Sequence, residues 1–181
     1  TALTKLVCYD NQINGENMTK LVTSLPSRKG MSAGSLIVVN RSEDEKNLCR
    51  PSDIAIAQEK NWTLKWKNGQ PYKGIGEGVI TMITSRAVGR TVQLRIEANS
   101  DVLIEGVRES PQQYRNNYTL TSQTITIQGD VTELDCSKNQ LTSLDVSKNT
   151  SLTMLSCNGN QLTRLDLSGS PALTELDCNN N

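Results

Sequence analysis

One eleven-residue motif recurs at a fixed spacing and constrains the fold of this chain more than any other feature. It reads VTELDCSKNQL from Val131 and LTMLSCNGNQL from Leu152, and a third copy, LTELDCNNN, begins at Leu173. Consecutive copies therefore begin 21 residues apart, and a partial copy, LTKLVCYDNQI, spans residues 3–13. Self-similarity at a period of roughly 20 to 50 residues is typical of proteins built from stacked structural repeats. Each copy is therefore expected to form one unit of a stack.

Alternation within the motif predicts one short strand per copy. Leu134 and Cys136 are two residues apart and point to one side of such a strand, while Glu133 and Asp135 point to the other. Stacked copies would pair these strands into a parallel sheet whose outward side chains form a concave binding face. The candidate binding residues on that face are Glu133, Asp135, Ser137, Met154, Ser156, Asn158, Glu175, Asp177 and Asn179.

The inward positions of the motif predict a structural ladder. Its members are Cys136, Cys157, Cys178, Asn139, Asn160 and Asn181. An asparagine amide both donates and accepts hydrogen bonds, so it suits a position where the chain turns out of a sheet. The cysteines are interpreted as small buried hydrophobic residues. The chain has no histidine and no CxxC pair, so we expect no metal site and no cofactor.

The sequence pattern LTxLDCSxNQLTSLDVSKNTxL resembles the short leucine-rich repeats of surface proteins from Bacteroidetes bacteria, a group often described as internalin-related. The resemblance covers residues 131–181 closely and 1–13 in part. It implies a leucine-rich repeat solenoid with a parallel β-sheet. It also implies a secreted bacterial protein, extracellular or at the cell surface, whose function is adhesion or protein–protein recognition. Solenoids of this kind bind many unrelated partners, so the fold alone does not identify one.

Residues 1–70 are predicted to be the last repeat and an α/β cap of an upstream array. Apolar spacing predicts helices over 15–25 and 51–60, with Pro26 beyond the first and Pro51 opening the second. Short apolar or alternating runs predict strands over 35–40 and 62–66. This order resembles the C-terminal cap of the ribonuclease-inhibitor type. Trp62 and Trp66 are expected to cover the end of that cap, with sugar stacking as the alternative.

A glycine-rich stretch at 71–78 is predicted to be a linker, and residues 79–130 a small antiparallel β unit that caps a second repeat array over 131–181. The polar loop 110–117 is expected to be mobile. The fold class predicted for the whole chain is therefore α/β: solenoid pieces with a ribonuclease-inhibitor-like cap, joined to a small antiparallel β unit. The chain begins and ends within repeats, so we expect a fragment of a longer protein with an uncapped edge at 173–181.

An enzyme is not expected, because no nucleophile and base pair is evident and the carboxylates recur only because the motif recurs. Asp145 and Asp166 are interpreted as turn residues that bond their own backbone, with a calcium site as the alternative. We expect instead a non-catalytic protein that recognises a host or bacterial surface protein. A purely structural spacer and a carbohydrate-binding module are the alternatives.

Other partner classes follow from charge and hydropathy. Nineteen basic residues balance nineteen acidic residues and aromatic residues are scarce, so no nucleic-acid partner is expected. No apolar run approaches ~18 residues, so no membrane insertion is expected. End-to-end self-association through the uncapped repeats is the remaining expectation.

Overall fold

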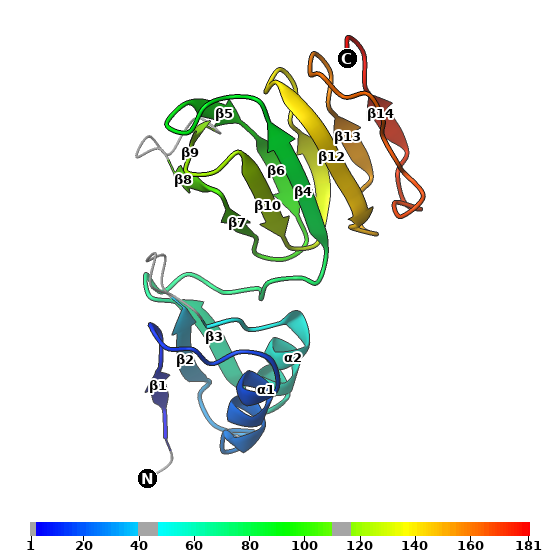
Figure 1. The fold of residues 1–181 in the computed structure, drawn as a ribbon. Helices are drawn as coiled ribbons and strands as arrows, with labels where there is room; N and C mark the ends of the chain where they lie inside the picture. Colours follow the sequence, from blue (N-terminus) through cyan, green and yellow to red (C-terminus); the bar gives the residue numbers. More distant parts are fainter. Residues whose placement is uncertain (1–2, 40–46, 110–116) are drawn as a thin grey trace. The chain divides into compact units, whose positions relative to one another are not determined.

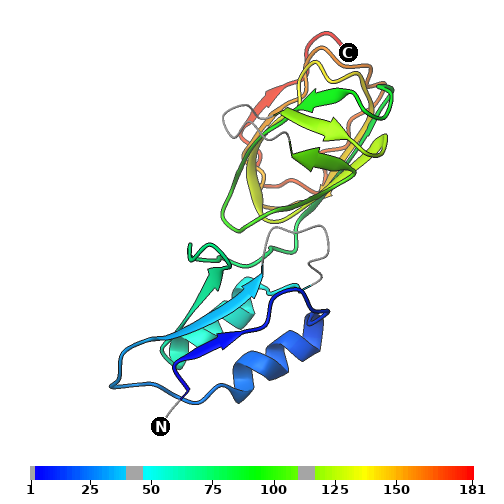
Figure 2. The same ribbon diagram turned by 90° about the vertical axis from the view of Figure 1, so that its left-hand side faces the viewer.

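A computed structural model describes residues 3–39, 47–109 and 117–181 (Figures 1 and 2). The chain divides into two compact units, Thr1–Ile75 and Gly76–Asn181. Each unit encloses its own cluster of buried apolar side chains. Two sequence predictions fall partly on residues that the structure does not describe. These are the last residue of the strand predicted over 35–40 and residues 110–116 of the loop predicted over 110–117.

The first unit is a parallel sheet with two helices on one face. Its elements in chain order are β1 (Lys5–Val7), α1 (Gly15–Ser24), β2 (Gly34–Val39), α2 (Pro51–Glu59) and β3 (Trp62–Trp66). The strands are parallel in the order β1-β2-β3. Figures 1 and 2 show α1 and α2 on the same side of this sheet. Alternate strand residues such as Leu36 and Leu64 are buried together with Met18 and Val22 of α1.

The second unit contains the remaining strands, which form two larger sheets and one small sheet. The strands are β4 (Val79–Thr84), β5 (Thr91–Gln93), β6 (Arg95–Ala98), β7 (Leu103–Glu105), β8 (Val107–Glu109), β9 (Asn117–Leu120), β10 (Thr124–Gln128), β11 (Val131–Asp135), β12 (Leu141–Lys148), β13 (Met154–Ser156) and β14 (Glu175–Asp177). The two larger sheets have the orders β12-β4-β10-β7 and β14-β13-β11-β6.

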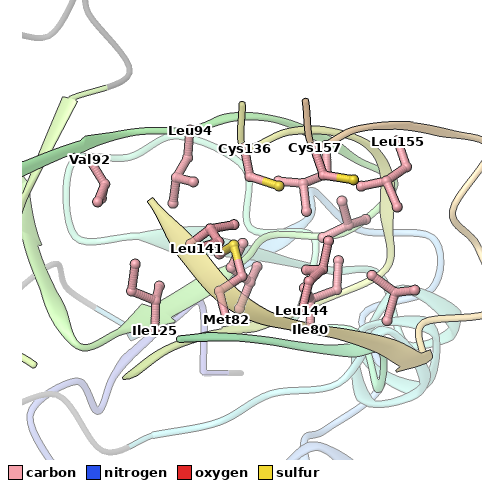
Figure 3. Close-up of a cluster of buried hydrophobic side chains, with 14 of the residues drawn as sticks. Ile80, Met82, Val92, Leu94, Ile125, Cys136, Leu141, Leu144, Leu155 and Cys157 are labelled. Carbon is pink, nitrogen blue, oxygen red and sulfur yellow. The ribbon is translucent and has the colours of Figure 1, made fainter. Parts of the chain in front are cut away.

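Apolar side chains from the two larger sheets meet in one core. Figure 3 shows Leu94, Cys136 and Cys157 from one layer facing Ile80, Met82 and Leu144 from the other. This arrangement follows from period-two alternation, because each sheet places its apolar residues on a single face. Strands from 79–130 and strands from 131–181 contribute to this core together.

A small sheet of order β5-β9-β8 covers one end of that core. β5 leads directly into β6 and β8 follows β7 after Gly106, so the small sheet connects the edge strands of the two larger sheets. At the opposite end lies β14, and within the described residues no strand pairs with its outer edge.

The predicted fold class is wrong. The described residues contain two helices and several small sheets that are mostly antiparallel, and they show no repeat solenoid. The second half of the first repeat forms β12, which pairs antiparallel with β4. β11 also pairs antiparallel with β6 on one side. β4 and β6 satisfy backbone groups that a solenoid would satisfy with further repeats.

No helix among the described residues is both long enough and apolar enough to cross a lipid bilayer.

Candidate functional site

The strands that carry the candidate residues all end in the same turn. Directly before the ladder asparagines, Lys138 and Asn180 have φ of 57° and Gly159 has φ of 63°. Asp10, directly before Asn11, has φ of 58°. Left-handed backbone of this kind is found mainly at Gly, Asn and Asp, and it reverses the chain within a single residue. All four copies of the motif therefore share one local conformation.

Each ladder asparagine joins two neighbouring strands. The side-chain amide of Asn160 donates to the carbonyls of Cys136 (3.1 Å) and Cys157 (2.9 Å), and its carbonyl accepts from the backbone N–H groups of Asn139 (2.9 Å) and Leu141 (3.1 Å). Asn139 joins the first copy of the motif to the segment before β6 in the same way, because its side-chain amide donates to the carbonyls of Cys136 and Gln93. Asn181 donates to the carbonyls of Cys157 and Cys178. These bonds fix the spacing and register of the strands.

The predicted binding residues lie together on the outer side of the β6-β11-β13-β14 sheet. We call this surface the outer strand face: Glu133, Asp135, Ser137, Met154, Ser156, Asn158, Glu175, Asp177 and Asn179, together with Arg95 and Glu97 of β6. In the observed register, Met154 lies between Glu133 and Glu175. Ser156 lies between Asp135 and Asp177 in the adjacent row.

Arg95 and Glu97 belong to this face but were not among the predicted residues. β6 pairs antiparallel with β11, which places Glu97 beside Glu133 and Arg95 beside Asp135. Their alternation with Leu94 and Ile96 indicates two outward side chains, but nothing in that pattern indicates that β11 is the neighbouring strand. The sequence therefore indicates that Arg95 and Glu97 point outward, but it does not indicate that they lie beside the residues of β11.

Hydrogen bonds order the carboxyl-terminal part of the outer strand face. The hydroxyls of Ser137 and Ser156 are 3.0 Å apart, and the amide of Asn158 donates to Ser156 (3.1 Å) and to the carboxylate of Asp177 (2.7 Å). Asn179 also donates to Asp177 (2.7 Å). Across the described ranges, no lysine or arginine forms an ion pair with the carboxylates of this face. The carboxylates of this face are therefore not held in ion pairs within the chain.

The ladder cysteines differ in exposure along the stack. Cys136 and Cys157 are fully buried thiols, whereas Cys178 is exposed. Burial, together with the nearby Cys178 and Asp177, raises the pKa of the Cys157 thiol from 9.0 to about 11. Burial also raises the pKa of Cys136 well above its ordinary value. Both thiols therefore remain protonated at neutral pH and serve as apolar packing groups.

These shifted pKa values predict that the second unit loses stability in alkaline solution. A thiol whose pKa is raised by folding stabilises the folded state fully below its unfolded pKa, and that contribution is lost as pH rises through the folded pKa. Between pH 9 and 10, Cys136 and Cys157 should together lower the free energy of unfolding by about 2–3 kcal/mol. Urea titrations followed by circular dichroism would measure this loss.

The double variant Cys136→Ala/Cys157→Ala is the comparison for that experiment, with Cys178→Ala as the matched exposed control. The double variant should lose much less stability over the same pH step, because alanine has no proton to release. Cys178→Ala should follow the unmodified protein. An equally steep pH dependence in the double variant would assign the alkaline loss to other groups.

Asp145 and Asp166 lie on the opposite surface of the unit and not on the outer strand face. Each carboxylate accepts the backbone N–H two residues further on, that of Ser147 and that of Ser168, at 2.9 Å. The hydrogen bonds from these serines lower the pKa of both carboxyls. A shallow depression of about 420 Å³ includes both aspartates and Arg164. In the described part of the chain, no group of three or more His, Cys, Asp or Glu side chains is arranged to hold a metal ion.

The two tryptophans lie in the first unit, on β3. Trp62 is 1% exposed and its indole N–H donates to the carbonyl of Pro26 at 2.8 Å. Trp66 is half-buried and meets Tyr72 edge-on, with ring centroids 5.0 Å apart. Sugar stacking needs an exposed ring face, and Trp62 offers none. Trp62 therefore gives the carbohydrate-binding alternative no support.

Comparison of the chain with models of protein families, with curated proteins and with solved structures gives no match. The resemblance to Bacteroidetes leucine-rich repeat proteins therefore remains a prediction from the motif.

Proposed function

We propose that this chain is a non-catalytic recognition protein that binds a basic patch on a partner protein through the outer strand face. Following the family resemblance, we propose that this recognition takes place outside a bacterial cell or at its surface. The observation that carries the proposal is the arrangement of acidic side chains in register across neighbouring strands, with Met154 between two of them.

Charge supports a basic partner. Five carboxylates on this face, those of Glu97, Glu133, Asp135, Glu175 and Asp177, are accompanied by one basic side chain, Arg95. The charge of the whole chain is balanced, so this is a local excess and not a general property. Complementary charges across an interface raise the rate of association and select the correct partner. The partner should therefore present lysine or arginine side chains at this face.

An apolar contact supports a protein partner over a simple counterion. Met154 is half-buried at the centre of the acidic row, where its flexible thioether could contact an apolar group of the partner. Interfaces between proteins are enriched in methionine and combine a small apolar centre with a polar rim. On the outer strand face, Met154 would supply the apolar centre and the surrounding polar side chains the rim.

Backbone pairing supports binding with little rearrangement. β11, β13 and β14 are held in register by strand hydrogen bonds and by the buried asparagines behind them. Side chains on such a sheet have little freedom to lose on binding, which lowers the entropic cost of association. The serine and asparagine bonds to Asp177 restrict the face further.

The test is capture of proteins from an extract of host-cell surface and extracellular matrix. The chain should capture a basic protein, and the variant Glu97→Lys/Glu133→Lys/Asp135→Lys should lose that capture by at least about tenfold, because like charges replace complementary ones. Binding of the purified captured protein should also weaken as salt concentration rises.

A matched control carries the same change in charge elsewhere. Glu16→Lys/Glu59→Lys/Glu105→Lys alters three exposed carboxylates outside the outer strand face and should bind like the unmodified chain. Both variants should unfold at temperatures close to that of the unmodified chain, since all six side chains are at least partly exposed. Equal capture by the two variants would contradict the proposal, and capture by none would favour the structural spacer.

A further inference from the structure

We infer that two copies of this chain associate face to face, with the outer strand face of one copy against the helix-free face of the β1-β2-β3 sheet of the other. The inference deepens the proposed function and rests on it, because it assigns a basic patch to which the outer strand face binds. The contact joins two sheet faces and uses no strand edge. We call the second surface the lysine face; it consists of Lys5, Val7, Ser35, Ile37, Thr63 and Lys65.

The lysine face is the side of the first unit's sheet that the helices do not cover. Figures 1 and 2 show α1 and α2 on one side of this sheet, and Leu36 and Leu64, which point to that side, are at most 2% exposed. Successive side chains of a strand point to opposite faces. Val7 is accordingly 47% exposed, Lys5 is exposed, and Lys65 is half-buried. These side chains are therefore accessible to a second molecule.

Basic and apolar side chains lie together on the lysine face. In the observed register, one row contains Lys5, Ser35 and Thr63, and the next row contains Val7, Ile37 and Lys65. The three strands contain no aspartate or glutamate. Within the described ranges, neither lysine of this face forms an ion pair. The surface therefore presents two positive charges beside an apolar pair.

The lysine face and the outer strand face use the same outward positions of the repeated motif, with different side chains. Lys5 in LTKLVC occupies the position of Glu133 in VTELDC and of Glu175 in LTELDC. Val7, two residues later, occupies the position of Asp135 in the first of those copies. One motif thus supplies a basic and apolar surface in the first unit and an acidic surface in the second.

The two units also differ in net charge. Residues 1–75 contain eleven basic and seven acidic residues, whereas residues 76–181 contain eight basic and twelve acidic residues. The balanced charge of the whole chain therefore arises from one basic unit and one acidic unit. Complementary charge steers association and selects the correct orientation of two molecules. The acidic unit of one copy should therefore attract the basic unit of another.

Apolar side chains are placed to meet at the centre of the contact. Met154 lies between carboxylates on the outer strand face, and Val7 and Ile37 lie beside lysines on the lysine face. Two sheets pack face to face at a distance of about 10 Å, with side chains of the facing surfaces interdigitating. Contact of Met154 with Val7 and Ile37 would remove apolar surface from water, while the lysines face the carboxylates around it.

Sedimentation velocity over a concentration series at low salt tests the inference. The unmodified chain should show a sedimentation coefficient that rises with concentration and a weaker rise at high salt. Lys5→Glu/Lys65→Glu and Glu97→Lys/Glu133→Lys/Asp135→Lys should each shift association to at least about tenfold higher concentration, because like charges then face one another. An equimolar mixture of the two variants should restore association, because one retains the outer strand face and the other retains the lysine face.

Lys20→Glu/Lys29→Glu is the matched control for the lysine variant. It makes the same change in charge at exposed positions on α1 and in the loop that follows it, away from the lysine face. It should associate like the unmodified chain. A monomer at every concentration would overturn the inference. Association of either face variant at the concentration of the unmodified chain would also overturn it, as would a mixture that remains monomeric.

Capture from the host-cell extract separates failure of this inference from failure of the proposed function. Lys5→Glu/Lys65→Glu retains the outer strand face, so it should capture the basic protein at least as well as the unmodified chain. Capture by a chain that stays monomeric would overturn self-association and leave the proposed function in place. Loss of association in both face variants, with no protein captured by any chain, would support self-association and count against a separate partner protein.

Discussion

Replacement of Asn160 by alanine is expected to lower the free energy of unfolding of the second unit by about 3–5 kcal/mol. Asn160 satisfies four backbone groups on two neighbouring copies, the carbonyls of Cys136 and Cys157 and the N–H groups of Asn139 and Leu141. It is 7% exposed, so water does not readily replace those bonds. The substitution leaves the N–H groups of Asn139 and Leu141 without this acceptor, whereas the two carbonyls keep the side-chain amides of Asn139 and Asn181. A buried polar group that loses its partner costs roughly 1–3 kcal/mol. Urea titration followed by circular dichroism measures the loss.

Gln161→Ala is the matched control for that substitution. Gln161 is adjacent in sequence but exposed, and it has one weak contact of 3.3 Å with Ser85. Its replacement should change stability by less than about 0.5 kcal/mol. A loss below about 1 kcal/mol for Asn160→Ala would show that the asparagine ladder does not hold the strands in register.

Replacement of Gly106 by alanine is the second large effect, with an expected loss of more than about 3 kcal/mol or failure of the second unit to fold. Gly106 joins β7 to β8 with φ of +83°, a conformation that side chains disfavour. An added Cβ would also lie 2.0 Å from the backbone carbonyl oxygen of Thr124. That oxygen is in the neighbouring strand β10, which cannot move without disturbing its pairing with β4 and β7.

Gly89→Ala separates the two causes. Gly89 has a similar φ of +86°, but an added Cβ there meets no atom within 4 Å. Its replacement should cost about 1 kcal/mol from backbone strain alone. Thermal unfolding of both variants measures the difference. Equal losses at Gly106 and Gly89 would mean that strain, and not close approach of β7 to β10, limits the size of this position.

Local patterns in the sequence predicted individual elements well. The spacing of Met18, Leu21 and Val22 predicted a helix where α1 lies, and Pro51 predicted the start of α2. Alternation predicted a strand where β3 lies, and residues 79–130, which include β4 and β10, were predicted to form an antiparallel β unit. These elements depend mainly on side-chain periodicity and on the residues that begin or end a helix, which a linear sequence displays directly.

Strand partners were not predictable in the same way, and the predicted fold class failed for that reason. LTSLDVS at 141–147 and LTRLDLS at 162–168 are nearly identical, yet the first lies within β12 and the second is outside any strand. The difference is β4, which pairs with β12 over the register from Leu141 to Lys148. β4 lies more than fifty residues earlier in the chain, and periodicity carries no information about so distant a partner.

The candidate site was predicted only in part, because strand partners could not be predicted from the sequence. Alternation around Leu134 and Leu155 indicated which side chains point outward, and the structure places Glu133, Met154 and Glu175 in one row. Arg95 and Glu97 join the outer strand face only because β6 pairs with β11.

Recognition by the outer strand face is tested most directly by an amide spectrum of the isotopically labelled chain, recorded by nuclear magnetic resonance while the captured basic protein is added. We expect shift changes concentrated at 133–137, 154–158 and 175–179, with smaller changes at Arg95 and Glu97. Little change should occur in α1, α2 or β4. Changes confined to the first unit, or to the surface around Asp145 and Asp166, would contradict recognition by the outer strand face.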